Sequence, residues 1–148
     1  MPGPLRPDRV LVWIANRRDA DLTVQILKDG GHRAERCSGP GDLLAAMREG
    51  AGCAVIAEEE LTATAKQALV QLLAAQPPWS DFPLIIFCAR RGGRLEDLGN
   101  VYRLDRPVRV ATLLIAVRSA LRARRRQYEA EEAIRLRDQF LAMLGQAA

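Results

Sequence analysis

The sequence predicts an α/β fold, a doubly wound five-stranded parallel sheet with helices on both faces and an extended helix at its carboxyl end. Short apolar runs alternate with stretches whose apolar residues recur at helical spacing. Strands that are apolar on both faces are typical of a parallel sheet buried between two layers of helices. With 148 residues, of which 49% are hydrophobic, the chain is long enough for one such domain and too short for two.

The first strand and the helix after it have clear boundaries. Arg9–Ala15 is an apolar run rich in β-branched residues, and Asn16 ends it. A helix is predicted at Asp19–Asp29, with Asp19 as its N-cap and Gly30–Gly31 as its stop. This segment therefore has the order strand, loop, helix and turn.

The alternation continues along the chain. Helices are predicted at Gly41–Glu49 and Thr62–Ala75, and Pro77–Pro78 prevents the second from continuing. The further strands are predicted at His32–Cys37, Cys53–Ala57, Pro83–Ala89 and Val101–Leu104. Between the last two strands, the polar, glycine-rich stretch Arg90–Asn100 is expected to be a connection without a helix. Pro107 is expected at the first position of the last helix.

The last helix is predicted to run beyond the domain. No Gly or Pro interrupts residues 108–144, so a helix of about 55 Å can form. Its early part can pack on the sheet, whereas its later part repeats apolar residues every seven positions, interrupted at Arg122–Glu132. An exposed apolar face predicts a dimer through this helix. The residues expected on the dimer and signalling face are Leu114, Val117, Leu121, Tyr128, Leu136, Phe140, Met143 and Leu144.

Composition argues against most enzyme classes. Three widely spaced cysteines, Cys37, Cys53 and Cys88, provide neither a disulfide framework nor a paired-cysteine metal site. One histidine, His32, is too little for a zinc site or a histidine-based triad. We therefore expect no catalytic residues, no metal ion and no cofactor. With no apolar run of roughly 18 residues and no signal peptide, we expect a cytoplasmic chain without a membrane partner.

Four predicted strand ends carry the segments VLVWIAN, CAVIAEEEL, PLIIFCA and LDRP. With the order of the elements, these segments resemble the receiver domain of bacterial two-component systems over roughly residues 9–121. In that family an acidic pair after the first strand holds magnesium, and an aspartate after the third accepts phosphate. A Thr or Ser follows the fourth strand, and a Lys before Pro follows the fifth. The carboxylates hold the cation, while the cation and the lysine neutralise the phosphoryl charge.

Most of these positions hold another kind of residue in this chain. The corresponding residues are Ile14 and Ala15 for the acidic pair, Ala57 or, with the alignment shifted by one, Glu58 for the acceptor, Cys88 for the hydroxyl and Arg106 for the lysine. The resemblance therefore implies a receiver-like domain with a degenerate phosphoacceptor pocket.

Glu58 leaves two interpretations open. An ion pair between Glu58 and Arg106 would imitate a permanently charged, active state. Alternatively, Glu58–Glu60 is a solvated acidic run at a strand end. A functioning phosphoacceptor response regulator with an atypical pocket stays open as an alternative function.

The tail has a second resemblance. The segment LRDQFLAMLG is similar to the opening of the dimerisation and histidine-phosphotransfer helix of sensor histidine kinases, and it places Gln146 where those kinases carry the phosphorylated histidine. The resemblance implies a leader at residues 1–8, a receiver-like domain at 9–121 and a helical coiled-coil linker at 122–148. It implies a non-catalytic module that passes a partner or ligand signal through a dimeric helix. The partner would be a histidine kinase core, in cis or in trans, or another two-component protein.

The tail also carries most of the net charge of +4. Residues 118–148 hold seven arginines and four acidic residues, a balance of +3. A basic helical run such as Arg122–Arg126 can bind nucleic-acid phosphates, which keeps a nucleic-acid adaptor as an alternative. However, no aromatic residue interrupts this run, and the acidic residues of Glu129–Glu132 are spaced to pair with neighbouring arginines. We therefore do not expect a nucleic-acid partner.

Overall fold

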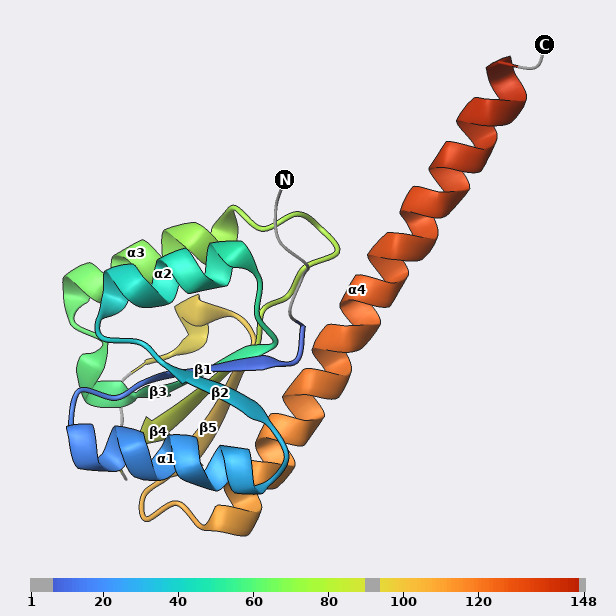
Figure 1. The fold of residues 1–148 in the computed structure, drawn as a ribbon. Helices are drawn as coiled ribbons and strands as arrows, with labels where there is room; N and C mark the ends of the chain where they lie inside the picture. Colours follow the sequence, from blue (N-terminus) through green and yellow to red (C-terminus); the bar gives the residue numbers. More distant parts are fainter. Residues whose placement is uncertain (1–6, 90–93, 147–148) are drawn as a thin grey trace.

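A five-stranded parallel sheet forms the centre of the structure, a computed structural model that describes residues 7–89 and 94–146 (Figure 1). Its strands are β1 (Arg9–Trp13), β2 (Arg33–Arg36), β3 (Cys53–Ala57), β4 (Leu84–Cys88) and β5 (Val101–Asp105). The strand order is β2-β1-β3-β4-β5, and all neighbouring strands are parallel. The predicted fold class, including the extended last helix, is confirmed.

Helices cover both faces of the sheet. One face carries α1 (Arg17–Asp29) and the first part of α4 (Val110–Gln146), and the other carries α2 (Pro40–Glu49) and α3 (Ala63–Ala74). Two short 3-10 helices, η1 (Glu58–Glu60) and η2 (Glu96–Leu98), follow β3 and precede β5.

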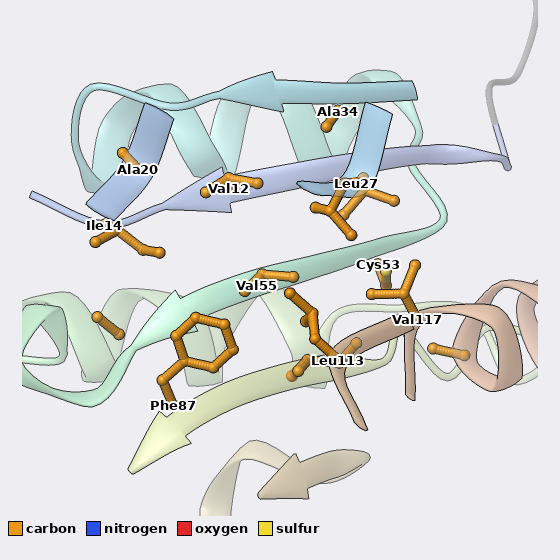
Figure 2. Close-up of a cluster of buried hydrophobic side chains, with 14 of the residues drawn as sticks. Val12, Ile14, Ala20, Leu27, Ala34, Cys53, Val55, Phe87, Leu113 and Val117 are labelled. Carbon is orange, nitrogen blue, oxygen red and sulfur yellow. The ribbon is translucent and has the colours of Figure 1, made fainter. Parts of the chain in front are cut away.

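The central strands are buried because they contribute to two cores. All five residues of β3 and of β4 are buried. On one face, Val55 and Phe87 pack with Leu113 and Val117 of α4 (Figure 2). On the other face, Ile56 packs with side chains of α2 and α3. Because successive strand residues point to opposite faces, this two-sided burial explains the nearly continuous apolar runs.

The start of α1 corrects one prediction. The N-cap is Asn16, whose Oδ1 accepts a hydrogen bond from the backbone N–H of Asp19 at 3.0 Å. Asp19, the predicted cap, therefore lies in the first turn, where its carboxylate favours the positive end of the helix. At the other end, a Cβ on Gly30 would lie 2.7 Å from Leu114, so the absent side chain lets the turn after α1 approach α4.

The start of α4 corrects the prediction that the last helix begins at Pro107. Pro107 is not the first helical residue, because its peptide bond with Arg106 is cis and the helix begins at Val110. The carbonyl of Arg109 accepts the early helical hydrogen bond from the N–H of Leu113 at 3.0 Å. The predicted connection Arg90–Asn100 contains η2 within its described part, and residues 90–93 lie outside the described residues.

Helix α4 has two parts with different surroundings. Val117, Leu121 and Arg124 are buried against the domain, whereas every described side chain from Ala133 to Gly145 is exposed. Figure 1 shows this second part leaving the body. Val117 and Leu121, which the sequence placed on a dimer face, are thus already used within the domain core. No helix in the described ranges is long and apolar enough to cross a membrane.

Candidate functional site

The carboxyl ends of the strands bring the predicted pocket residues to one edge of the sheet. Cys88 lies fully buried at the end of β4, and Ile14, just after β1, is buried in the core. Ala15 and Arg106 are exposed. The edge therefore combines an apolar floor with a solvent-facing arginine and holds no acidic pair after β1.

The two residues proposed for the acceptor position have different environments. Ala57 is the last residue of β3, fully buried in the core shared with α1 and α4. Glu58 follows it as the first residue of η1 and is half-buried at the sheet edge. Since a buried methyl group offers no chemistry, Glu58 is the only one of the two that could act on a ligand.

The glutamates of η1 each contact the end of a different strand. Glu59 accepts two hydrogen bonds from the Arg106 guanidinium, at 2.7 and 2.8 Å, just after β5. Glu60 accepts a hydrogen bond from the backbone N–H of Ala15, after β1. Glu58 lies beside the thiol of Cys88 at the end of β4, which donates to the carbonyl of Ile86 at 3.4 Å, and the carboxylate helps raise the pKa of this thiol. The acidic run, which follows β3, thus lies against the ends of β1 on one side and of β4 and β5 on the other.

Of the two interpretations left open for Glu58, the ion pair with Arg106 is not the one observed. The bidentate partner of Arg106 is Glu59, and Glu58 acts on Arg106 only as a nearby charge. The hydrogen bonds from Arg106 lower the pKa of Glu59, and the same contact raises the pKa of Arg106. The interpretation of Glu58–Glu60 as a merely solvated run is also too simple, since all three side chains have a partner or a charged neighbour at the edge.

Burial, and secondly the neighbouring Glu58 carboxylate, raise the pKa of the Cys88 thiol to about 11. A thiol with such a pKa is protonated at neutral pH and is a poor nucleophile. Within the described residues, no three His, Cys, Asp or Glu side chains converge as they would to hold a metal ion. The edge is consequently suited to internal hydrogen bonding and charge pairing.

A small cavity connects this edge with the beginning of α4. It has a volume of about 180 Å³, and its lining includes Thr23 of α1, Phe87 of β4, Arg106 and Leu113 of α4. The same side chain that binds Glu59 therefore also borders the helix that leaves the body. Sequence patterns did not reveal this cavity, because it depends on how α1 and α4 pack together.

A second cluster at the opposite end of the sheet was also missed. Arg124 of α4 is only 5% exposed, and its guanidinium lies 4.7 Å from the ring centroid of Tyr128, 5.2 Å from that of Phe82 and 5.6 Å from that of Trp79. It donates hydrogen bonds to Ser80 Oγ at 2.7 Å and to Gln127 Oε1 at 2.7 Å. We call Arg124 and these three rings the arginine–aromatic cluster.

The arginine–aromatic cluster holds a charge with no carboxylate in ion-pair contact, although Asp81 acts on it from farther away. No ion pair among the described residues involves Arg124, whereas Arg9, the other buried arginine, pairs with Glu35 at 3.0 Å. Burial lowers the pKa of Arg124, and the π faces of the rings compensate part of the lost hydration. The spacing of Arg124 from Leu113, Val117 and Leu121 follows one helical stripe, which is the signal that would have predicted its burial.

Comparisons with solved structures identify the fold. The response regulator StyR aligns over 90% of this chain and 69% of its own, with 19% identity and a TM-score of 0.77. A response regulator receiver domain protein from Clostridium thermocellum aligns over 79% of this chain and 96% of its own, with 17% identity and a TM-score of 0.65. A sensor protein from Polaromonas sp. JS666 aligns over 78% of this chain and 97% of its own, with 15% identity and a TM-score of 0.62. No protein-family model and no curated protein matches the sequence. The chain therefore has the fold of a receiver domain.

Proposed function

We propose that this chain is a non-catalytic signal-transmission module of a two-component system. In this proposal a degenerate receiver domain at residues 9–121 passes the influence of a partner or ligand to a helical linker at residues 122–148. The observation that carries the proposal is the bidentate Glu59–Arg106 pair within the η1 network. The carboxylate of Glu59 binds the guanidinium of Arg106, and Arg106 stands where a receiver has its phosphate-binding lysine. The edge thus has a fixed, charge-paired arrangement without phosphorylation.

The geometry supports a mechanical route for the signal. Arg106 lies four residues before the start of α4, and the small cavity beside it is bordered by Leu113. A partner that displaces the Glu59–Arg106 pair would change the packing of the first turns of α4. Because α4 is a continuous helix, such a change reaches its distal part as a rotation or a shift in register.

The distal part of α4 is the proposed output. Its apolar side chains Leu136, Phe140, Met143 and Leu144 are exposed in a single copy, and we propose that they form a coiled coil with a second copy. A histidine kinase core, in cis or in trans, or another two-component protein would respond to the relative rotation or register of the two helices in this dimer. Gln146 would stand in place of the phosphorylated histidine, so the module itself would have no autokinase activity. Its three cysteines are free and buried, which fits a cytoplasmic module.

One experiment tests the degenerate receiver. The chain is incubated with Mg²⁺ and acetyl phosphate or beryllofluoride, and its intact mass and one-dimensional NMR spectrum are recorded. We expect no covalent phosphate and no spectral change, because no acidic pair follows β1. A mass increase that disappears in Glu58→Gln but persists in Glu129→Gln would overturn the proposal in favour of a functioning phosphoacceptor.

A second experiment tests the output helix. We expect sedimentation equilibrium to show a dimer at micromolar concentration, and Phe140→Asp to make the chain monomeric. The matched control is Ala142→Asp, which places the same charge on the exposed opposite side of the helix and should leave the dimer intact. A wild-type monomer, or equal loss of the dimer in both variants, would rule out the proposed coiled coil.

A further inference from the structure

A basic cavity lies between the turn after α1 and the middle of α4, away from the strand-end edge. Its volume is about 430 Å³, and its lining includes Arg33 at the start of β2 and Arg118, Arg122 and Arg125 of α4. The three helical arginines are spaced by four and three residues, which places them on one face of the helix. His32, from the turn before β2, also lines the cavity.

The positive charge of this cavity is poorly compensated. Its one acidic lining residue, Asp8, is 3.9 Å from Arg33, and no ion pair among the described residues involves Arg118, Arg122 or Arg125. Four guanidinium groups thus line this cavity with one carboxylate, although Arg125 also borders a neighbouring hollow that contains Glu129. Like charges held together by the fold repel one another, and a bound anion would relieve that repulsion.

His32 gives a second observation at the same place. Its Nε2 atom is buried and has no hydrogen-bond partner among the described residues. Burial and the nearby charge of Arg118 lower the pKa of His32, so the ring is neutral at pH 7. A neutral imidazole can present an N–H to an anion oxygen if its tautomer places the proton on that nitrogen. The cavity therefore offers one unused polar atom in addition to its arginines.

We propose that this cavity binds the oligophosphate group of a small anion, held by Arg33, Arg118, Arg122 and Arg125. Planar guanidinium groups match phosphate oxygens with two parallel hydrogen bonds. The volume exceeds what a single phosphate fills, and four arginines suit an anion with several negative charges. No Phe, Tyr or Trp side chain lines the cavity, so recognition rests on the phosphates more than on stacking of a base.

The surroundings favour a small anion over a nucleic acid. The basic run Arg122–Arg126 is divided by the fold, because Arg124 is buried in the arginine–aromatic cluster and Arg126 does not line the cavity. Farther along the same helix, Glu129, Glu131 and Glu132 would repel the continuing backbone of a long polyanion. The positive surface is therefore a concave site and not an extended track.

Isothermal titration with inorganic tripolyphosphate tests the site. We expect one tripolyphosphate per chain and an affinity that falls as salt rises. Arg122→Gln should weaken binding by roughly tenfold, because it removes charge-assisted hydrogen bonds. Arg137→Gln makes the same change in net charge 15 residues farther along the helix, about 22 Å away, and should alter the affinity less than about twofold. Arg118→Gln serves as an independent second variant of the site, and circular dichroism and thermal unfolding verify that each variant is folded.

The outcomes separate this site from general attraction of anions. Absence of saturable binding would overturn the proposal, and so would equal losses in Arg122→Gln and Arg137→Gln. Tighter binding of a DNA duplex than of tripolyphosphate, weakened by Arg122→Gln, would assign the surface to nucleic acid instead. Binding of tripolyphosphate does not depend on dimerisation or on the strand-end network, so its failure leaves the proposed signalling role untouched.

Discussion

At the scale of single residues, the difference between arginine and lysine decides what the sheet edge can do. A lysine ammonium is a point charge, whereas the Arg106 guanidinium binds both oxygens of Glu59 at once. That geometry fixes the carboxylate and uses the donors that would otherwise face an incoming anion. Arg106 is therefore engaged in an internal pair, which in the proposed degenerate receiver would take the place of a captured phosphoryl group.

The pH dependence of stability reports this pair. Glu59 has a lowered pKa in the folded state, so its contribution to stability is present above its ordinary pKa of 4.5 and is lost as the pH falls through the lower folded-state value. Glu59→Gln should reduce the free energy of unfolding at pH 7 by at most about 1 kcal/mol, since the pair is exposed. Urea unfolding of both proteins should show this difference shrinking below pH 4.5. Glu129→Gln is the control, and a difference that does not change with pH would contradict the assignment.

The cysteines give another prediction at this scale. Burial raises the pKa of Cys53 to about 12 and is the main cause that raises those of Cys37 and Cys88 to about 11. We expect a thiol-reactive disulfide reagent at neutral pH to label the native chain slowly and to label all three cysteines after denaturation. Rapid labelling of one native cysteine, identified by peptide mapping as Cys88, would instead indicate a reactive thiol at the sheet edge.

At the scale of elements, Arg124 fixes where α4 leaves the body. Replacing it with Ala removes contacts with three rings and leaves the part-buried Ser80 Oγ without this donor, whereas Gln127 Oε1 still accepts a hydrogen bond from the backbone N–H of Asp81. We expect Arg124→Ala to lower the free energy of unfolding by about 3 kcal/mol. Arg126→Ala, an exposed neighbour, should change it by less than about 0.5 kcal/mol. Urea unfolding measures both, and equal effects would show that the arginine–aromatic cluster contributes nothing specific.

The elements also show how far sequence reasoning reaches. The strands were predictable because a chain buried on both faces must be apolar at nearly every position, as in β3 and β4. Helix starts were less predictable, since Asn16 and Asp19 are both good caps and only the backbone path selects one. The residues of the predicted pocket lie at one edge of the sheet, but the choice of Glu59 over Glu58 as the partner of Arg106 depends on the turn made by η1. Burial of Arg124 depends on three rings distant in sequence, a long-range contact that local patterns do not contain.

At the scale of the whole molecule, the two parts of α4 have different sources of stability. The part up to Tyr128 packs on the domain, whereas residues 133–145 are exposed throughout and gain nothing from the core. A helix without tertiary contacts is marginally stable in water at this length. In the proposed dimer, association would supply the contacts that the distal part lacks and would couple its folding to the concentration of the chain.

This coupling predicts that the helical signal in far-ultraviolet circular dichroism falls on dilution through the range in which sedimentation shows the dimer dissociating. Phe140→Asp should show, at every concentration, the weak helical signal of the diluted unchanged chain, because the charge prevents the apolar faces of two helices from packing together. Trypsin should then cut after Arg135 and Arg137 faster in the diluted or substituted chain, while cleavage within the domain stays slow. Ala142→Asp should behave like the unchanged chain. If the helical signal and the cleavage rate were both independent of concentration, the distal helix would be stable alone, and association would not be what orders it.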